Sequence, residues 1–138
     1  MIRFSQVNVQ IVSGTGSTNG AVNGEGNLIV GYAENASNFS RTGSHDLVVG
    51  ANNGWKSYGE IVGGNQNQAL GTYATVFGRS NKASGGASLA AGEANTASGG
   101  SSSVSGGVHN TASGSYASVT GGCSNIAGAG TASGGWRG

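Results

Sequence analysis

The sequence predicts an all-β, single-domain parallel β-solenoid of about eight coils, each roughly 14 residues long. Three observations predict this fold class. Glycines recur in pairs seven residues apart, and the first members of successive pairs stand 14 or 15 residues apart through most of the chain. Single apolar residues alternate with polar ones inside each unit. The chain has 29 glycines and no proline, in a spacing too regular for a flexible linker.

Each coil is expected to hold two short strands, because apolar residues alternate at every second position and a helix would need them three or four apart. Glycines at the ends of the strands supply the positive φ angles of tight corners. One apolar column is expected to be the structural core: Ile29, Val48, Val62, Val76, Val104 and Val119. A second column is expected at Val22, Arg41, Trp55, Ala69, Ala83, Ala97, Ala112 and Ile126.

The repeat divides the chain into three parts. We expect residues 1–21 to form an N-terminal strand or cap, residues 22–135 to form the repeats with an insertion at 32–41, and residues 136–138 to form a C-terminal cap. Corner asparagines are expected to adopt a left-handed backbone and to stack as a structural ladder. They are Asn67, Asn81, Asn95, Asn110 and Asn125.

Apolar residues also flank the core column. In a strand, Leu28 and Val30, or Leu47 and Val49, point away from the column residue between them and onto the outer face. A coil with one valine inside is very narrow, and an exposed apolar face favours association. The sequence therefore predicts an obligate oligomer.

Composition and charge exclude several classes of function. A net charge of +1 with 8% charged residues gives no electrostatic basis for binding nucleic acid or an anionic membrane. The 36% of hydrophobic residues form no run long enough to insert into a membrane. The titratable residues are scattered along the chain, so we expect no enzyme, no catalytic residue and no cofactor.

Metal binding is not expected either. His45 and His109 lack ligands at zinc spacing, and the single Cys123 is expected to be a small packing residue. Asp46 and Glu60 share a position in adjacent coils, where stacked carboxylates can bind a cation. The favoured interpretation is that they are solvated edge residues.

Candidate binding residues lie where the repeat breaks down. These places are the insertion YAENASNFSRT, the stretch NNGWKSYGE and the ending GGWRG. Aromatic rings stack on sugars and apolar protein patches, and neighbouring amides bond hydroxyl groups. The candidates are Tyr32, Asn35, Asn38, Phe39, Arg41, Trp55, Lys56, Tyr58, Trp136 and Arg137. In the alternative interpretation, the insertion is a tolerated surface loop and the two tryptophans cap the solenoid.

Three repeats, NKASGGASLAAG, NTASGGSSSVSG and NTASGSYASVTG, resemble the head repeats of YadA-type trimeric autotransporter adhesins, which read roughly A-x-A-x-G-x-x-S-x-A-x-G. The likeness is good over residues 67–122 and looser over 22–64 and 123–135. It implies a left-handed parallel β-roll, assembled as a homotrimer on a cell surface or extracellular fibre, that binds a glycan or protein ligand.

The stalk and membrane anchor of that family are absent from this chain. We therefore expect an excised head or tip, with export signal and anchor outside this chain, or a relative from a phage tail fibre or the fibre of a predatory bacterium. A second hypothesis is a purely structural spacer, whose repeats only extend a fibre.

Overall fold

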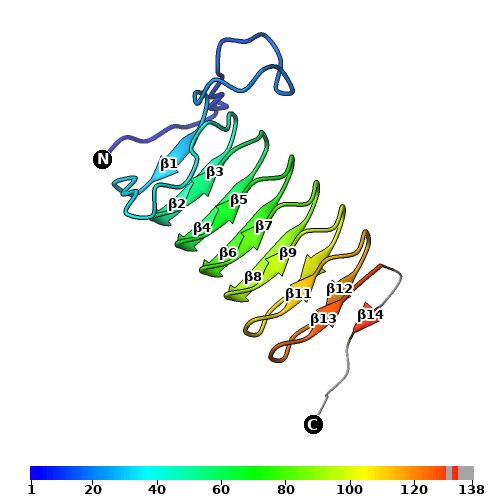
Figure 1. The fold of residues 1–138 in the computed structure, drawn as a ribbon. Coiled ribbons are helices and arrows are strands. Elements are labelled where there is room, and N and C mark those ends of the chain that lie inside the picture. The colour runs from blue at the N-terminus through cyan, green and yellow to red at the C-terminus, as the bar shows by residue number, and fades with distance from the viewer. Residues whose placement is uncertain (130–131, 134–138) are drawn as a thin grey trace.

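The computed structural model describes residues 1–129 and 132–133. Over these residues the chain is an all-β parallel solenoid of about 6 turns (Figure 1). None of the described residues lies in a helix, and so none forms a helix able to cross a membrane. The predicted all-β parallel β-solenoid is confirmed.

Two parallel sheets face each other across the narrow interior. Sheet A contains β1 (Leu28–Val30), β2 (Leu47–Ala51), β4 (Ile61–Asn65), β6 (Thr75–Arg79), β8 (Leu89–Glu93), β10 (Ser103–Val104), β12 (Ser118–Val119) and β14 (Ala132–Ser133). Sheet B contains β3 (Gly54–Trp55), β5 (Gln68–Ala69), β7 (Lys82–Ala83), β9 (Thr96–Ala97), β11 (Thr111–Ala112) and β13 (Ile126–Ala127). The chain alternates between the sheets, so each strand pairs with the strand one turn away.

The turns that carry a strand in both sheets number about 6, running from β2–β3 to β12–β13. Sheet A extends beyond them by β1 at one end and β14 at the other. The described residues therefore do not show the expected eight complete coils. At the N-terminal end the reason is the insertion at 32–41, which takes the place of a sheet B strand after β1.

The core is a pair of stacked columns. In sheet A the register joins Val48, Val62, Val76, Ala90, Val104 and Val119, all of which are buried. Ile29, expected in the core, is 39% exposed because no strand covers it on the far side of β1. In sheet B, Ala112 pairs with Ala127 rather than with the expected Ile126, which is 74% exposed.

Corner glycines explain this shift of one residue. The left-handed corner after sheet A is occupied in turn by Gly50, Gly64, Gly78, Gly92, Gly107 and Gly122. A Cβ on Gly64 would lie 2.0 Å from the carbonyl oxygen of Gly78, so only glycine fits this stack. The spacing of the glycine pairs predicts Gly106 and Gly121 at this corner. In the structure Gly107 and Gly122 occupy it, and the sheet B residue in register with Ala112 is therefore Ala127 rather than Ile126.

An asparagine ladder closes the same corner, as predicted, and it begins with Asn53. Each backbone N–H donates to the side-chain oxygen of the asparagine one turn earlier, as Asn81 does to Asn67 at 2.9 Å. Each Nδ2 donates to corner carbonyls, as Asn81 does to Phe77 and Gly92. The left-handed residue is the one before each asparagine, not the asparagine itself: Asn52, Gln66, Ser80, Ala94, His109 and Ser124.

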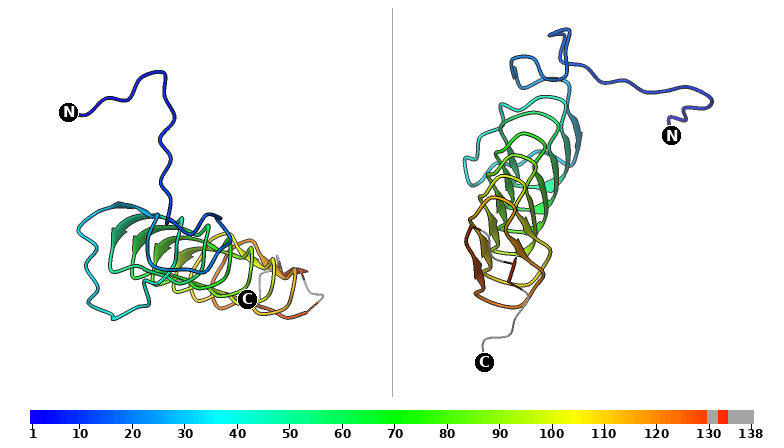
Figure 2. Two further views of the ribbon diagram at one scale, coloured as in Figure 1. Left: turned by 90° about the horizontal axis from the view of Figure 1, so that it is seen from above. Right: turned by 90° about the vertical axis from the view of Figure 1, so that its right-hand side faces the viewer.

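The N-terminal 27 residues contain no strand, so of the expected strand or cap at residues 1–21 the strand is not formed. We call residues 1–12 the arm. It projects away from the solenoid (Figure 2), and residues 13–27 form a loop over the N-terminal end. The expected C-terminal cap at 136–138, with Trp136 and Arg137, lies outside the described residues.

Candidate functional site

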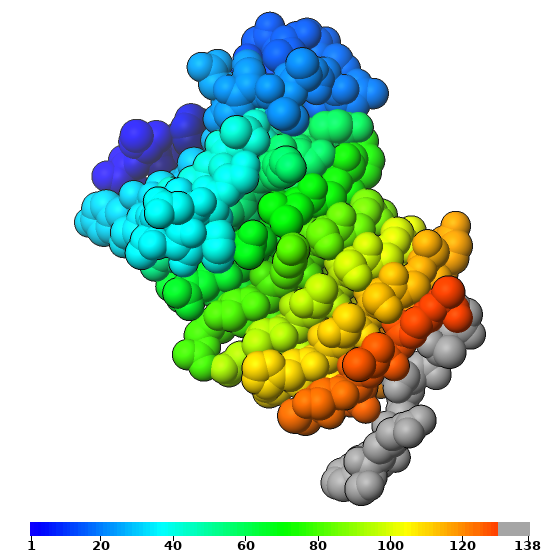
Figure 3. All heavy atoms as spheres, viewed as in Figure 1, coloured from blue at the N-terminus to red at the C-terminus, as the bar shows by residue number. Residues whose placement is uncertain are grey.

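The insertion at 32–41 forms a loop that stands out from the first coil (Figure 3). Asn35 closes a turn inside it, accepting from Phe39 N–H at 2.9 Å and donating to the Phe39 carbonyl at 3.1 Å. Phe39 packs against Gly54, where an added Cβ would lie 2.6 Å from the phenylalanine Cβ. Both residues therefore shape the loop rather than present themselves to a ligand.

Arg41 braces the loop against the solenoid. Its Nε donates to the Asn53 carbonyl at 2.9 Å, and its terminal nitrogens donate to the carbonyls of Ala33 and Glu34. The guanidinium also lies over the Trp55 ring, 5.0 Å from its centroid. Partial burial lowers the pKa of Arg41, and the Glu34 carboxylate opposes that shift. Arg41 thus connects the start of the loop to the solenoid through its hydrogen bonds.

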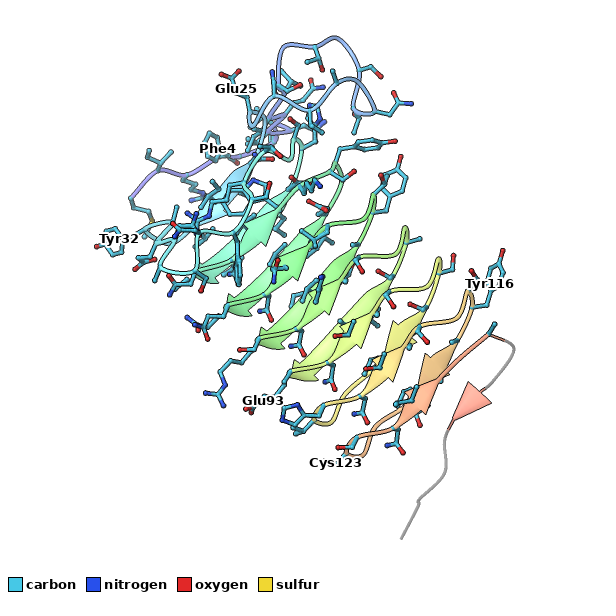
Figure 4. The ribbon with its side chains drawn as sticks, in the orientation of Figure 1. Phe4, Glu25, Tyr32, Glu93, Tyr116 and Cys123 are labelled. Atoms are coloured by element: carbon cyan, nitrogen blue, oxygen red, sulfur yellow. The ribbon has the colours of Figure 1, made fainter. Side chains whose placement is uncertain are left out.

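Tyr32 and Asn38 are both exposed in this loop, as are Glu34, Ala36 and Ser40. Tyr32 is 94% exposed and points outward (Figure 4). Asn38 lies at a left-handed turn position with φ of 51°. A loop that presents an exposed aromatic ring and an exposed amide has the chemistry of a contact surface for a sugar or a protein.

Trp55 does not join that surface. It begins the sheet B column, pairs with Ala69 and is 4% exposed. Its ring occupies the interior position that alanine takes in the later turns. A buried Trp55 is unable to stack on a ligand, so its place among the candidate binding residues is not supported by its position.

Lys56 and Tyr58 lie at the opposite corner, beyond the other end of β3. Lys56 is exposed, and Tyr58 makes an edge-to-face contact with Tyr73, with 5.3 Å between ring centroids. Strand β3 separates these residues from the insertion. The sequence candidates within the described residues therefore divide between two corners rather than converging on one site.

Two carboxyl groups lie inside the solenoid, contrary to the expectation that they are solvated edge residues. Asp46 is 3% exposed and Glu60 is 1% exposed. Asp46 Oδ1 accepts from Glu60 N–H at 2.8 Å, and Glu60 Oε2 accepts from the N–H groups of Lys56 and Ser57 at 2.8 and 3.1 Å. The remaining oxygens, Asp46 Oδ2 and Glu60 Oε1, have no hydrogen-bond partner.

Burial raises the pKa of Asp46 to about 7, against the lowering effect of the hydrogen bond from Glu60 N–H. Burial and then the Asp46 charge raise the pKa of Glu60 to about 8, against the backbone hydrogen bonds that it accepts. The pair therefore retains protons near neutral pH. The sequence carried a signal for burial: the same position in later coils holds Ala74, Ser88, Ser102 and Ala117.

A cavity of about 450 Å³ lies under the N-terminal loop, lined by residues between Gln10 and Thr18 and by His45. His45 Nε2 accepts from Ser13 N–H at 3.1 Å, which makes this nitrogen the unprotonated one and leaves the proton on Nδ1. His45 is the only titratable side chain lining the cavity. Within the described residues no three His, Cys, Asp or Glu side chains gather closely enough to hold a metal ion. Cys123, expected to pack inside, is exposed.

The outer face of sheet A was not among the candidate site residues, although its flanking positions were recognised as apolar. Its exposed members, which we call the apolar face, are Leu28, Val30, Leu47, Val49, Ile61 and Phe77. Their exposed fractions lie between 38% and 54%. Phe77 covers Gly63 on the adjacent strand, where a Cβ would lie 2.7 Å from its ring. In β10 and β12 the equivalent positions hold serine and threonine.

The chain thus carries two surfaces suited to contact with other molecules, the braced loop at 32–41 and the apolar face of sheet A. Comparison with protein-family models, with curated proteins and with solved structures finds no match to this chain.

Proposed function

We propose that this chain is a non-enzymatic subunit of a trimeric fibre head or tip, of the β-roll type seen in YadA-like adhesins, that binds a glycan or protein ligand. Its place is a cell surface or an extracellular fibre. The observation that carries the proposal is the apolar face, six large apolar side chains exposed side by side on sheet A. Soluble monomers rarely expose such a face, so other copies of the chain cover it.

The loop at 32–41 supports the binding part of the proposal. Recognition residues are commonly placed on loops held by a rigid scaffold. Here Arg41 ties the loop to the first coil, and Tyr32 stands free of any such tie. The loop adjoins the N-terminal end of the solenoid, which suits contact at the tip of a fibre (Figure 2).

The second candidate function is a structural spacer of a surface or phage tail fibre. The uniform coils from β8 to β13 favour it, because their small interior residues and asparagine ladder build length beyond the end of the apolar face. A spacer binds no ligand saturably, whereas a head or tip does.

Sedimentation equilibrium of the full chain tests the assembly. We expect a mass of three times 13.3 kDa at micromolar concentration. A monomer under these conditions would contradict the proposal, because the apolar face would then be stable in water.

Binding to glycan arrays and to whole cells tests the ligand function. Tyr32→Ala should weaken saturable binding at least about tenfold, as loss of an aromatic contact residue does. The matched control is Tyr116→Ala, which removes an 83% exposed tyrosine far along the rod and should leave binding unchanged. A trimer that binds nothing saturably would favour the spacer.

A further inference from the structure

The arm, residues 1–12, has the sequence of a strand but pairs with nothing. All of its residues are exposed, and no hydrogen bond within the described part of the chain involves them. Val7, Val9 and Ile11 alternate with Asn8 and Gln10, so an extended arm presents one apolar side. These three apolar side chains are 63%, 58% and 41% exposed.

Only one surface of the solenoid has matching chemistry. The outer face of sheet B carries Gln68, Lys82, Thr96 and Thr111 in successive strands, with a single exposed apolar side chain, Ile126, at the end of the row. The C-terminal half of sheet A presents Ser103 and Ser118. The apolar face, over β1 to β6, is the remaining surface and the one on which the apolar side of the arm can be buried.

The arm leads away from its own apolar face. Ser13, at the base of the arm, is held by its N–H donating to His45 and by its carbonyl accepting from Asn23 at 3.0 Å. From this fixed point the arm extends outward, away from the coils (Figure 2). Gln6 has a left-handed φ of 56°, so the extended part of the arm is residues 7–12, which reach about 20 Å. Strands β1 to β6 of a neighbour span only about 15–20 Å at 4.8 Å per strand.

We propose that the arm of one copy packs Val7, Val9 and Ile11 onto the apolar face of a neighbouring copy. This exchange of arms rests on the trimer proposed above, and it identifies the segment that covers the apolar face. Each copy donates one arm and receives one, so the contact repeats around a closed ring and leaves no arm exposed.

Disulfide trapping between differently tagged chains tests the exchange. One chain carries Val9→Cys and the other Val49→Cys, both with Cys123→Ser, and the two are refolded together. We expect a covalent heterodimer as the main oxidised product. The matched control replaces Val49→Cys with Thr120→Cys, on the same outer row of sheet A but in its polar half, and should trap at least about tenfold less. Equal trapping at both positions, or none, overturns the proposal.

A single chain carrying Val9→Cys, Val49→Cys and Cys123→Ser tests the alternative of folding back. A covalent monomer as the main product would show that the arm covers its own face, and would overturn the exchange. Covalently linked multimers support it.

Charge placed on either side of the arm gives a second readout. Val9→Asp should shift the full chain toward smaller species in sedimentation, while Asn8→Asp, on the opposite side, should not. Equal effects of the two substitutions contradict the proposal. A parent trimer whose arm is not trapped refutes the exchange alone, whereas a monomeric parent refutes the proposed assembly as well.

Discussion

Asp46 and Glu60 fill interior positions that later coils give to alanine and serine. Together with Asn27, whose Oδ1 accepts from Asp46 N–H at 2.8 Å, they form a short polar column under the first turns. Asn27 and Asp46 each accept from a backbone N–H of the coil that follows, whereas Glu60 accepts from Lys56 N–H and Ser57 N–H in the turn just before it. Within this column Glu60 N–H donates to Asp46 Oδ1. At the equivalent position one coil later, Ala74 N–H donates to the Gly71 carbonyl instead.

The raised pKa values of this pair predict a stability that depends on pH. In the unfolded chain the carboxyls titrate near 3.8 and 4.5, and in the folded chain near 7 and 8. Their contribution is complete below about pH 4 and is lost as pH rises through about 7 to 8. The thermal unfolding midpoint should therefore fall between pH 5 and pH 9.

The double variant Asp46→Asn with Glu60→Gln keeps the acceptor oxygens and removes the charges. It should unfold at nearly the same temperature across this range, and above the parent at pH 9. Glu25→Gln, which alters an exposed carboxylate, should leave the pH dependence of the parent in place. A double variant that still loses stability with rising pH would contradict the assignment.

Adjacent glycines at one corner predict opposite responses to alanine. Gly107 has φ of 83°, and a Cβ there would lie 2.1 Å from the Gly122 carbonyl oxygen. Gly106 has no positive φ and nothing within 4 Å of an added Cβ. Gly107→Ala should cost at least about 2 kcal/mol in urea unfolding, whereas Gly106→Ala should be neutral or stabilising by about 0.5 kcal/mol. Comparable losses at both would refute the corner assignment.

Sequence periodicity predicted the sheet A partners from Val48 to Val119, because a repeat of 14 or 15 residues leaves each valine on the same face. The periodicity did not predict the corner residue where two adjacent glycines fit the repeat equally well. Gly106 and Gly107 are chemically the same, and only the close approach of the Gly92, Gly107 and Gly122 backbones distinguishes them. Ile126 was misplaced for the same reason.

The asparagine ladder is the main polar element of the fold. Asn81 donates two hydrogen bonds through Nδ2 and accepts one from Asn95 N–H, all at 2.7–2.9 Å. Because the residue is 1% exposed, water does not replace these bonds. The ladder ties each corner to the next turn, and its period matches that of the strands.

Asn81→Asp should therefore destabilise the rod strongly. The carboxylate keeps the acceptor for Asn95 N–H but faces the carbonyls of Phe77 and Gly92 without a donor. We expect a loss of about 2–4 kcal/mol in urea unfolding, with partial recovery at low pH. Ser80→Asp, one residue earlier and exposed, should change stability by less than about 0.5 kcal/mol. Similar losses for both substitutions would show that the ladder bonds contribute little.

The insertion at 32–41 was recognised from its length alone, as a coil longer than the repeat permits. The brace was not predictable, because Arg41 reaches backbone carbonyls that no side-chain pattern marks. For Trp55 the sequence allows either ligand binding or capping of the solenoid. Its burial at the head of the alanine column agrees with capping.

The whole molecule behaves as a stack in which each turn contacts its neighbours. Stability in such a stack is the sum of turn and interface terms, and about three turns are needed to hold together. A break near one end should therefore unfold the short side and spare the long one.

Val104→Asp makes that break, since it buries an unpaired charge in a fully buried position. We expect fast hydrogen exchange over residues 103–127 and continued protection over residues 47–83. Ser105→Asp, adjacent but exposed, should leave both regions protected. Uniform loss of protection along the chain would instead indicate a single all-or-none unit.

The left-handed residue before each ladder asparagine has a further consequence. Gln66, Ser80, Ala94, His109 and Ser124 differ in size and chemistry, yet their φ values all lie between 53° and 59°. The backbone conformation is therefore the same for several side chains that are unbranched at Cβ. Successive turns therefore present these side chains in a row, about 4.8 Å apart. Charged, dye-bearing or metal-binding groups can be placed along this row at multiples of that spacing by substitution.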